Sequence, residues 1–305
     1  MRIRVLGSGA GGGVPQWNCR CAYCERVRTA PSEVRPRTHT SIAVSADGDR
    51  WLICNASPDI HHQIEAFPEL LPHDGVRGTS IGAIALTGAD LDQILGLLLL
   101  REDKSLRVYG TERVRSALHD GLRVLPALAN YGGVAWESLT LDMDCSLADR
   151  TGAPLGLRCR AFPVAGGPPP YAGHRDQGQL GDTVGLLITD ALSGATVAFV
   201  PSCGALTDQL TELLSTADCV LFDATLWTDD DITVLGVPGR TGKSMMHMPL
   251  AEPGGTLDQL RLPHGRHILI HINNTNPLLV EGGPEQRLAA SRGWEVAYDG
   301  LELEL

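Results

Sequence analysis

Three cysteines crowd one short segment near the start of the chain, at Cys19, Cys21 and Cys24. Thiols at this spacing do not easily form relaxed disulfides with one another, but all three can bind the same soft cation. Zinc prefers thiolate sulfur and takes four ligands in a tetrahedron, so a fourth ligand must come from elsewhere. We therefore predict a structural zinc site here. The alternative interpretation is a set of free or buried thiols in a loop.

Potential metal ligands also follow three apolar segments that are typical of strands. Asp92 comes shortly after the first of them, Asp223 ends the second, and His271 ends the third. One imidazole and two carboxylates lie within the range of mononuclear non-haem iron sites, and zinc or manganese would accept them as well. Asp90 is a nearby acid. Capping of a helix explains Asp90 and Asp92 equally well, because acids favour the first turn.

His247 is a further candidate for the site. It follows Asp223 by 24 residues and precedes a predicted helix. Three roles are open to it: it could donate to the Asp223 carboxylate, act as a general acid or base, or complete the cysteine zinc site.

A glycine-rich loop, 7–13, follows the first predicted strand. Its letters match a dinucleotide-binding pattern, but loop-forming residues and the cysteines follow where that pattern needs a helix. We instead expect its backbone amides to face the carboxylates of a ligand, joined by Arg240 or Lys243. The alternative is that the glycines serve only tight turns.

The rest of the chain predicts a hairpin followed by mixed strands and helices. Strands are expected at 2–6, 40–45, 50–54, 81–86, 107–109, 157–162, 183–188, 196–200, 219–223, 267–271 and 295–297. Helices are expected at 60–67, 92–102, 111–121, 206–215 and 249–260. This order indicates two mixed sheets with helices outside, in a single domain over residues 1–305.

Composition narrows the class of protein. The chain has 305 residues, of which 43% are apolar and 20% charged, as in a globular protein with a large core. A net charge of −11 and a pI of about 5.3 give no general attraction to nucleic acid or anionic membranes. No apolar run is long enough to span a membrane. Eight cysteines without a signal peptide indicate reduced thiols and a cytoplasmic location.

The order of these residues resembles that of the metallo-β-lactamase superfamily. A strand, then Thr87 to Asp92, then an acid and a histidine at later strand ends, is similar to its metal-binding motifs. Longer blocks resemble one subfamily, the coenzyme PQQ synthesis protein B family. These blocks are Gly7–Cys19, Cys54–Asp59, Gly96–Glu102, Gly239–Gly242 and His271–Pro277.

The resemblance implies an α/β fold of the αββα type, in which two mixed β-sheets are flanked by helices. It implies a role in making pyrroloquinoline quinone (PQQ), as an iron-dependent hydroxylase of the tyrosine-derived ring of a cross-linked Glu-Tyr precursor. An alternative within the family is a carrier or transport factor for the quinone, and a metal-dependent hydrolase is a weaker one. The implied partner is the small, peptide-derived precursor, and a homodimer is a further expectation.

The chain departs from the superfamily at its metal motif. The pattern His-x-His-x-Asp-His here reads Gly88, Asp90, Asp92 and Gln93, and 163–167 contains no histidine. A two-metal hydrolytic site is therefore not expected, whereas one metal on Asp92, Asp223 and His271, with Gln93 or Asp90 nearby, is.

Two further positions stay open. In the superfamily's phosphodiesterase branch the fourth zinc ligand lies three residues after the last site histidine, and here that position is Asn274. His174 and Arg175 either line the mouth of the site or belong to a solvated loop.

Overall fold

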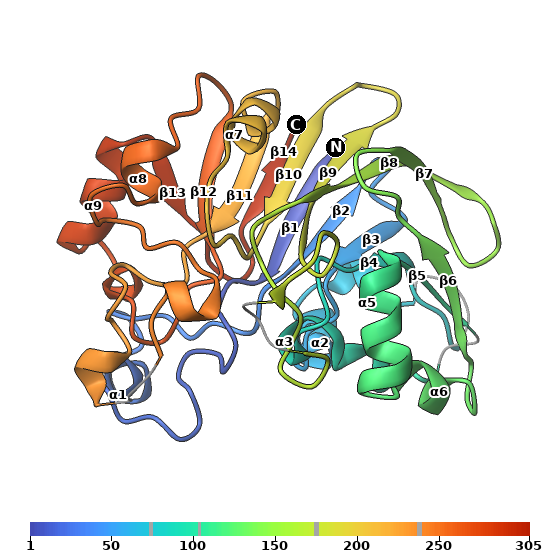
Figure 1. Ribbon diagram of the computed structural model, residues 1–305. Coiled ribbons are helices and arrows are strands. Elements are labelled where there is room, and N and C mark those ends of the chain that lie inside the picture. The colour runs from blue at the N-terminus through green and yellow to red at the C-terminus, as the bar shows by residue number, and fades with distance from the viewer. Residues whose placement is uncertain (73–75, 103–104, 174–176, 237–239) are drawn as a thin grey trace.

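The computed structural model describes residues 1–305 except 73–75, 103–104, 174–176 and 237–239. Two seven-stranded sheets pack face to face, and helices cover both outer faces (Figure 1). This is the αββα sandwich of two mixed sheets that the sequence predicted.

The first sheet joins the amino-terminal strands to the last strand of the chain. Its order is β14 (Glu302–Glu304), β1 (Arg2–Gly7), β2 (Ser41–Ser45), β3 (Trp51–Cys54), β4 (Ile81–Ala85), β5 (Leu106–Gly110) and β6 (Val134–Ser138). The pairs from β14 to β3 are antiparallel and those from β3 to β6 are parallel. The predicted hairpin is β2 and β3.

The second sheet repeats this mixed pattern. Its order is β13 (Trp294–Val296), β12 (Arg266–Ile270), β11 (Cys219–Asp223), β10 (Thr196–Val200), β9 (Val184–Asp190), β8 (Pro154–Pro163) and β7 (Asp144–Ala148). Strands β10 to β13 are parallel, and β7 to β10 are antiparallel.

Side chains that alternate between the two faces of each strand form three apolar cores, one between the sheets and one beneath the helices on each outer face. In β11, Cys219 and Leu221 join the core between the sheets, whereas Val220 and Phe222 join the core beneath the outer helices. Successive side chains of a strand point to opposite faces, so a strand covered on both sides must be apolar throughout.

Nine α-helices lie in the described part of the chain. They are α1 (Ala22–Thr29), α2 (Ile60–Glu65), α3 (Leu91–Ile94), α4 (Gly96–Leu99), α5 (Glu112–Ser116), α6 (Val124–Leu128), α7 (Asp208–Leu214), α8 (Thr256–Gln259) and α9 (Pro284–Ser291). Short 3₁₀ or π turns lie at Pro68–Leu70, Ala117–Gly121, Thr233–Leu235, Lys243–Met245 and Pro277–Leu279. None of these helices is long and apolar enough to cross a membrane.

Two predicted helices are shorter in the structure because their amides bond elsewhere. The helix predicted at 92–102 is divided into α3 and α4, since Gly96 N–H donates to the carbonyl of Ala56. Of the helix predicted at 249–260 only α8 forms, because the amides of Leu250 and Ala251 donate to the Leu226–Trp227 backbone. The cysteine segment, expected to be loop, runs into α1.

Candidate metal centre and its cavity

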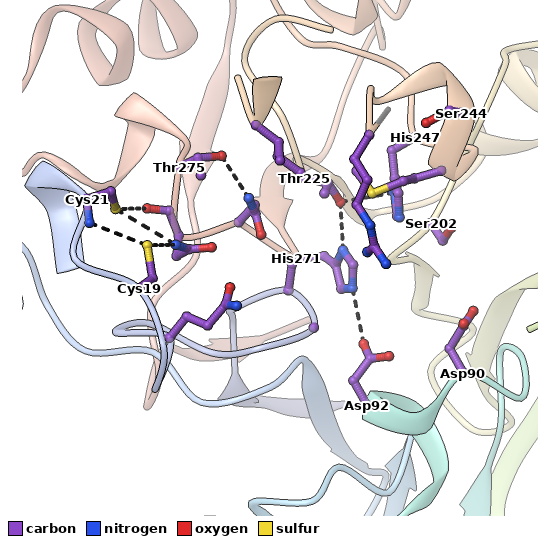
Figure 2. Close-up of a pocket in the computed structure, with 18 of the residues that line it drawn as sticks. Cys19, Cys21, Asp90, Asp92, Ser202, Thr225, Ser244, His247, His271 and Thr275 are labelled. Atoms are coloured by element: carbon purple, nitrogen blue, oxygen red, sulfur yellow. Dashed lines mark hydrogen bonds and ion pairs between the residues drawn. The ribbon is translucent and has the colours of Figure 1, made fainter. Parts of the chain in front are cut away.

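A cavity of about 1200 Å³ lies where strand ends of both sheets meet the glycine-rich loop and the cysteine segment. It brings together most of the candidate site residues. Those that line it are Cys19, Cys21, Asp90, Asp92, Gln93, Arg240, His247 and His271. Figure 2 shows Asp90 and Asp92 together at one end and the cysteines at the other. Asp223 and Cys24 are buried directly behind this lining.

The strand ends place the central side chains as the sequence predicted. Asp223 is the last residue of β11, and its neighbour in β12 is Ile270, so His271 comes next to it at the same sheet edge. Asp92 enters from the other sheet, at the start of α3. His271 has a φ of 65°, a left-handed conformation that is strained for histidine and is common at functional sites.

One hydroxyl, that of Thr225, connects these groups. It donates to Oδ1 of Asp223 at 2.6 Å and lies 2.7 Å from Nδ1 of His271. Because the hydroxyl proton is directed at Asp223, Nδ1 of His271 must be the donor to Thr225. In the neutral ring, Nε2 then carries only a lone pair, and it lies 3.4 Å from Oδ2 of Asp92 (Figure 2). Only a proton or a metal cation between these two atoms makes that approach favourable.

The pKa of Asp92 is consistent with a cation at this position. Burial raises it, but the hydrogen bond and the charge of His271 lower it below the ordinary value. Asp92 is therefore a carboxylate at neutral pH and a competent metal ligand.

His247 forms a hydrogen-bonded pair with Asp223, away from the His271 nitrogen that faces Asp92. Nδ1 of His247 donates to Oδ2 of Asp223 at 2.7 Å, and its ring stacks on His271 with centroids 5.3 Å apart. Burial raises the pKa of Asp223, but His247, His271 and the hydroxyl of Thr225 together lower it below the ordinary value. Of the roles predicted for His247, contact with Asp223 is the one the structure contains.

The predicted ligand set is thus divided by the imidazole of His271. Asp92 faces its Nε2, whereas Asp223 lies on the Nδ1 side. Asp223, His247 and His271 each offer an atom within 4.8 Å of the others, but those atoms already hydrogen-bond through Thr225. A cation there would have to replace these bonds. The expectation of one ion shared by Asp92, Asp223 and His271 is not the arrangement observed.

Gly88, Asp90 and Gln93 stand at the positions of the three motif histidines. Gln93 is 4% exposed, and its Oε1 has no hydrogen-bond partner within the described residues. A Cβ atom on Gly88 would lie 2.6 Å from that oxygen, so a larger residue there would displace the end of the Gln93 side chain. Asp90 is the N-cap residue of α3, but its carboxylate does not cap the described first turn.

The cysteine cluster has a fourth polar group beside its three sulfurs. The three sulfurs lie within 4.8 Å of one another, and all are free thiols. The amide nitrogen assigned to Asn274 lies 3.2 Å from Cys19, 3.8 Å from Cys21 and 3.4 Å from Cys24. A sulfur and an oxygen bound to tetrahedral zinc are about 3.5 Å apart. Since the two ends of an amide exchange by a half-turn, Asn274 can present Oδ1 as the fourth ligand.

The glycine-rich loop has few amides left for a ligand. Protein acceptors already bind the backbone amides of Ser8, Gly9, Ala10, Gly12, Gly13 and Val14. Gly11 and Ala10 nevertheless line the cavity. Arg240 brings positive charge to the same cavity. Arg20, which was not predicted from the sequence, also lines it but pairs with Glu25 at 3.3 Å, and Lys243 pairs with Glu252 at 3.8 Å. His174 and Arg175 lie outside the described residues.

Thr225 is a site residue that the sequence analysis did not single out, although its spacing offers a signal. It stands two residues after a strand-end acid, a spacing at which a hydroxyl commonly bonds the carboxylate. Asn274, by contrast, stands at the position that the spacing after His271 indicated.

Comparisons with known proteins place the chain among relatives of the same length. Residues 50–272 match the model of the beta-lactamase superfamily domain. Coenzyme PQQ synthesis protein B of Methylococcus capsulatus is 43% identical and that of Azotobacter vinelandii 42%, each over 100% of both chains. Zinc-bound PqqB from Methylobacterium extorquens has the same fold, with a TM-score of 0.90 at 38% identity over 100% of both chains. A diphosphatase of the PhnP family, at 20% identity and a TM-score of 0.68 (100% and 98% covered), shares the fold.

Proposed function

The chain belongs to the coenzyme PQQ synthesis protein B family of the β-lactamase superfamily, and from this premise we propose that it acts in pyrroloquinoline quinone biosynthesis. Full-length identity to relatives of that name supports the pathway assignment. The step we assign is iron-dependent hydroxylation of the tyrosine-derived ring of the cross-linked Glu-Tyr precursor, the small-molecule partner.

The approach of His271 to Asp92 carries this proposal. Two ligand atoms about 2.1 Å from a tetrahedral ion are about 3.4 Å apart, and Nε2 of His271 lies 3.4 Å from Oδ2 of Asp92. The Asp223–Thr225 pair holds Nδ1 of His271 as the donor, so that Nε2 remains a ligand.

Gln93 is the third group that fits a metal at this position. Its buried oxygen lacks a partner within the described residues, and it lines the same cavity as Asp92 and His271. Neutral amide oxygen is a weak ligand, so ferrous iron would be held loosely. Iron bound there would supply the activation of dioxygen that hydroxylation of an aromatic ring needs.

Asp223 and His247 would move protons beside the metal. Asp223 fixes His247 through Nδ1, which leaves Nε2 to take up or deliver a proton at the substrate. Thr225 links this pair to His271, so the acid–base and metal-binding halves share one hydrogen-bond network.

We assign a structural zinc ion to the cysteine cluster. Cys19, Cys21 and Cys24 would supply three sulfurs and Asn274 the fourth vertex. The related PqqB of Methylobacterium extorquens was crystallised with zinc bound, which supports the choice of metal. Zinc there would hold the cysteine segment against the cavity wall.

The cavity also suits a substrate rich in carboxylates. Arg240 provides a cation along its lining, and the Glu-Tyr precursor carries several negative charges. Arg240, rather than the largely bonded glycine-rich loop, is our candidate for substrate capture.

A non-catalytic carrier of the quinone is the second candidate. Gly88 and Gln93, in place of two histidines, favour it because they remove strong ligands. Gly88 and Asp90, at the positions of the two histidines of the superfamily's first metal site, leave a two-metal hydrolase without that site.

Metal analysis of anaerobically purified protein separates these functions. We expect about one zinc together with iron that can be reconstituted. After exposure of the precursor to dioxygen and a two-electron reductant such as ascorbate, we expect a product one oxygen atom heavier, with the second oxygen atom leaving as water. Zinc alone, with tight quinone binding and no oxygen added, would favour the carrier. The Asp92→Ala variant is the control, and it should lose iron while retaining zinc.

A further inference from the structure

The glycine-rich loop forms the wall of the cavity beside Asp92. Gly11 lines the cavity, and a Cβ atom built on it would lie 3.6 Å from Cγ of Asp92. Gly12 and Gly13 have φ values of 112° and 67°, which favour glycine. Glycines leave a loop conformationally free, so the position of this wall depends on its anchors.

Backbone contacts anchor the base of this loop, and a side chain anchors its tip. Ala10 donates to the carbonyl of Ile272 at 2.9 Å, and Gly13 donates back to Ala10 at 3.0 Å. The amide of Gly12, at the tip, donates to Nε2 of His39 at 3.1 Å.

His39 is itself held in the orientation and tautomer that this contact needs. Its Nδ1 lies 2.6 Å from Oδ2 of Asp59, and its backbone amide donates to the same oxygen at 2.9 Å. Gln63 donates to the His39 carbonyl at 2.8 Å. With the proton on Nδ1, the lone pair of Nε2 is free to accept from Gly12.

We propose that His39 is a positioning residue, which through Gly12 holds Gly11 against Asp92 and so sets the space at that carboxylate. Asp59 selects the tautomer, and the glycines allow the close approach. The consequence for metal binding rests on the proposed function, whereas the anchoring of the loop does not.

Two substitutions of His39 test the contacts of its two ring nitrogens separately. The amide of asparagine reaches the position of Nδ1, and that of glutamine reaches the position of Nε2. His39→Gln therefore keeps an acceptor for Gly12, whereas His39→Asn keeps only the contact with Asp59. We expect amide hydrogen exchange at Gly12 to be about tenfold faster in His39→Asn and within about threefold of wild type in His39→Gln.

Cobalt(II) binding supplies the second measurement. In protein whose cysteine site is first filled with zinc, the cobalt affinity of the cavity should fall about tenfold or more in His39→Asn and stay close to wild type in His39→Gln. Zinc content and circular dichroism check folding. If His39→Asn does not fold, Asp59→Ala replaces it, because removal of the acceptor for Nδ1 should also accelerate exchange at Gly12.

Equal exchange at Gly12 in wild type and His39→Asn would overturn the proposal, as would equal acceleration in both His39 variants. If cobalt does not bind the wild-type cavity, the proposed metal function fails, and exchange at Gly12 still decides the role of His39.

Discussion

The hydroxyl of Thr225 joins the two halves of the candidate centre at the scale of a single residue. It accepts from Nδ1 of His271, which places the ring proton on that nitrogen. It also donates to Asp223 and contacts Nδ1 of His247, the partner of that carboxylate. Asp92 and Gln93 then face the remaining nitrogen of His271 and the cavity. Single atoms in this network can therefore be removed with isosteric substitutions.

Thr225→Val removes the hydroxyl while keeping the shape of the side chain. Nδ1 of His271 then loses its acceptor, and we expect cavity metal affinity to fall by about 10- to 100-fold. Thr225→Ser keeps the hydroxyl and is the matched control. Cobalt titration of zinc-filled protein measures both, and unchanged affinity in Thr225→Val would contradict the role given to this hydroxyl.

Gln93→His should strengthen the same site. Imidazole is a better ligand for ferrous iron than a neutral amide, so iron affinity and any hydroxylation rate should rise. Asp92→Ala, which removes the facing carboxylate, should abolish both. Iron content after anaerobic reconstitution provides the measurement, and a Gln93→His variant with wild-type iron content and turnover would make the carrier the better interpretation.

At the scale of elements, the cysteine segment and the segment after β12 meet at one point. The cysteines enter at the start of α1, and Asn274 follows His271 by three residues. Zinc at the cysteines would therefore fix the segment that carries His271. This contact joins two parts of the chain about 250 residues apart.

Zinc binding at this junction should depend on pH. Burial raises the pKa of Cys24 to about 11, so without metal its thiol is protonated at neutral pH. Binding as a thiolate expels that proton, and zinc affinity should rise about tenfold per pH unit for each proton released. Chelator competition between about pH 6 and 8 measures the slope. Cys24→Ser should flatten it, whereas an affinity independent of pH in wild type would exclude thiolate binding by Cys24.

At the scale of the whole molecule, the chain ends close the sandwich. β14 pairs with β1, and the amino terminus donates to the carbonyl of Leu305 and lies 3.5 Å from Asp190 of the second sheet. Leu303 joins the core between the sheets. We propose on this basis that residues 1–305 form one domain.

Leu303→Ala tests the contribution of the last strand. Loss of a buried leucine leaves a cavity between the sheets, and the free energy of unfolding should fall by about 2–4 kcal/mol. Glu304→Ala, which changes the adjacent exposed side chain, should stay within about 0.5 kcal/mol of wild type. Denaturant unfolding of the zinc-loaded protein measures both, and similar values for the two variants would show that β14 contributes little.

The sequence by itself determined which residues reach the edge of the sandwich. Each apolar run predicts a strand, and the first polar residue after it marks the strand end, so Asp223, His271 and the loop bearing Asp92 could be assigned to that edge. The family motifs indicated the αββα fold. Shorter elements such as β6, β7 and α1 were missed because their alternation is weak or their cysteines suggested loop. Only the tertiary structure decided on which side of the His271 ring each acid lies. That choice depends on rotamers and tautomers set by Thr225, a neighbour that spacing along the chain does not reveal. Spacing after His271 pointed to Asn274, but its contact with the three cysteines was decided by the tertiary structure. The same holds for the contact of His39 with Gly12, because these partners are distant in sequence and come together only when the chain folds.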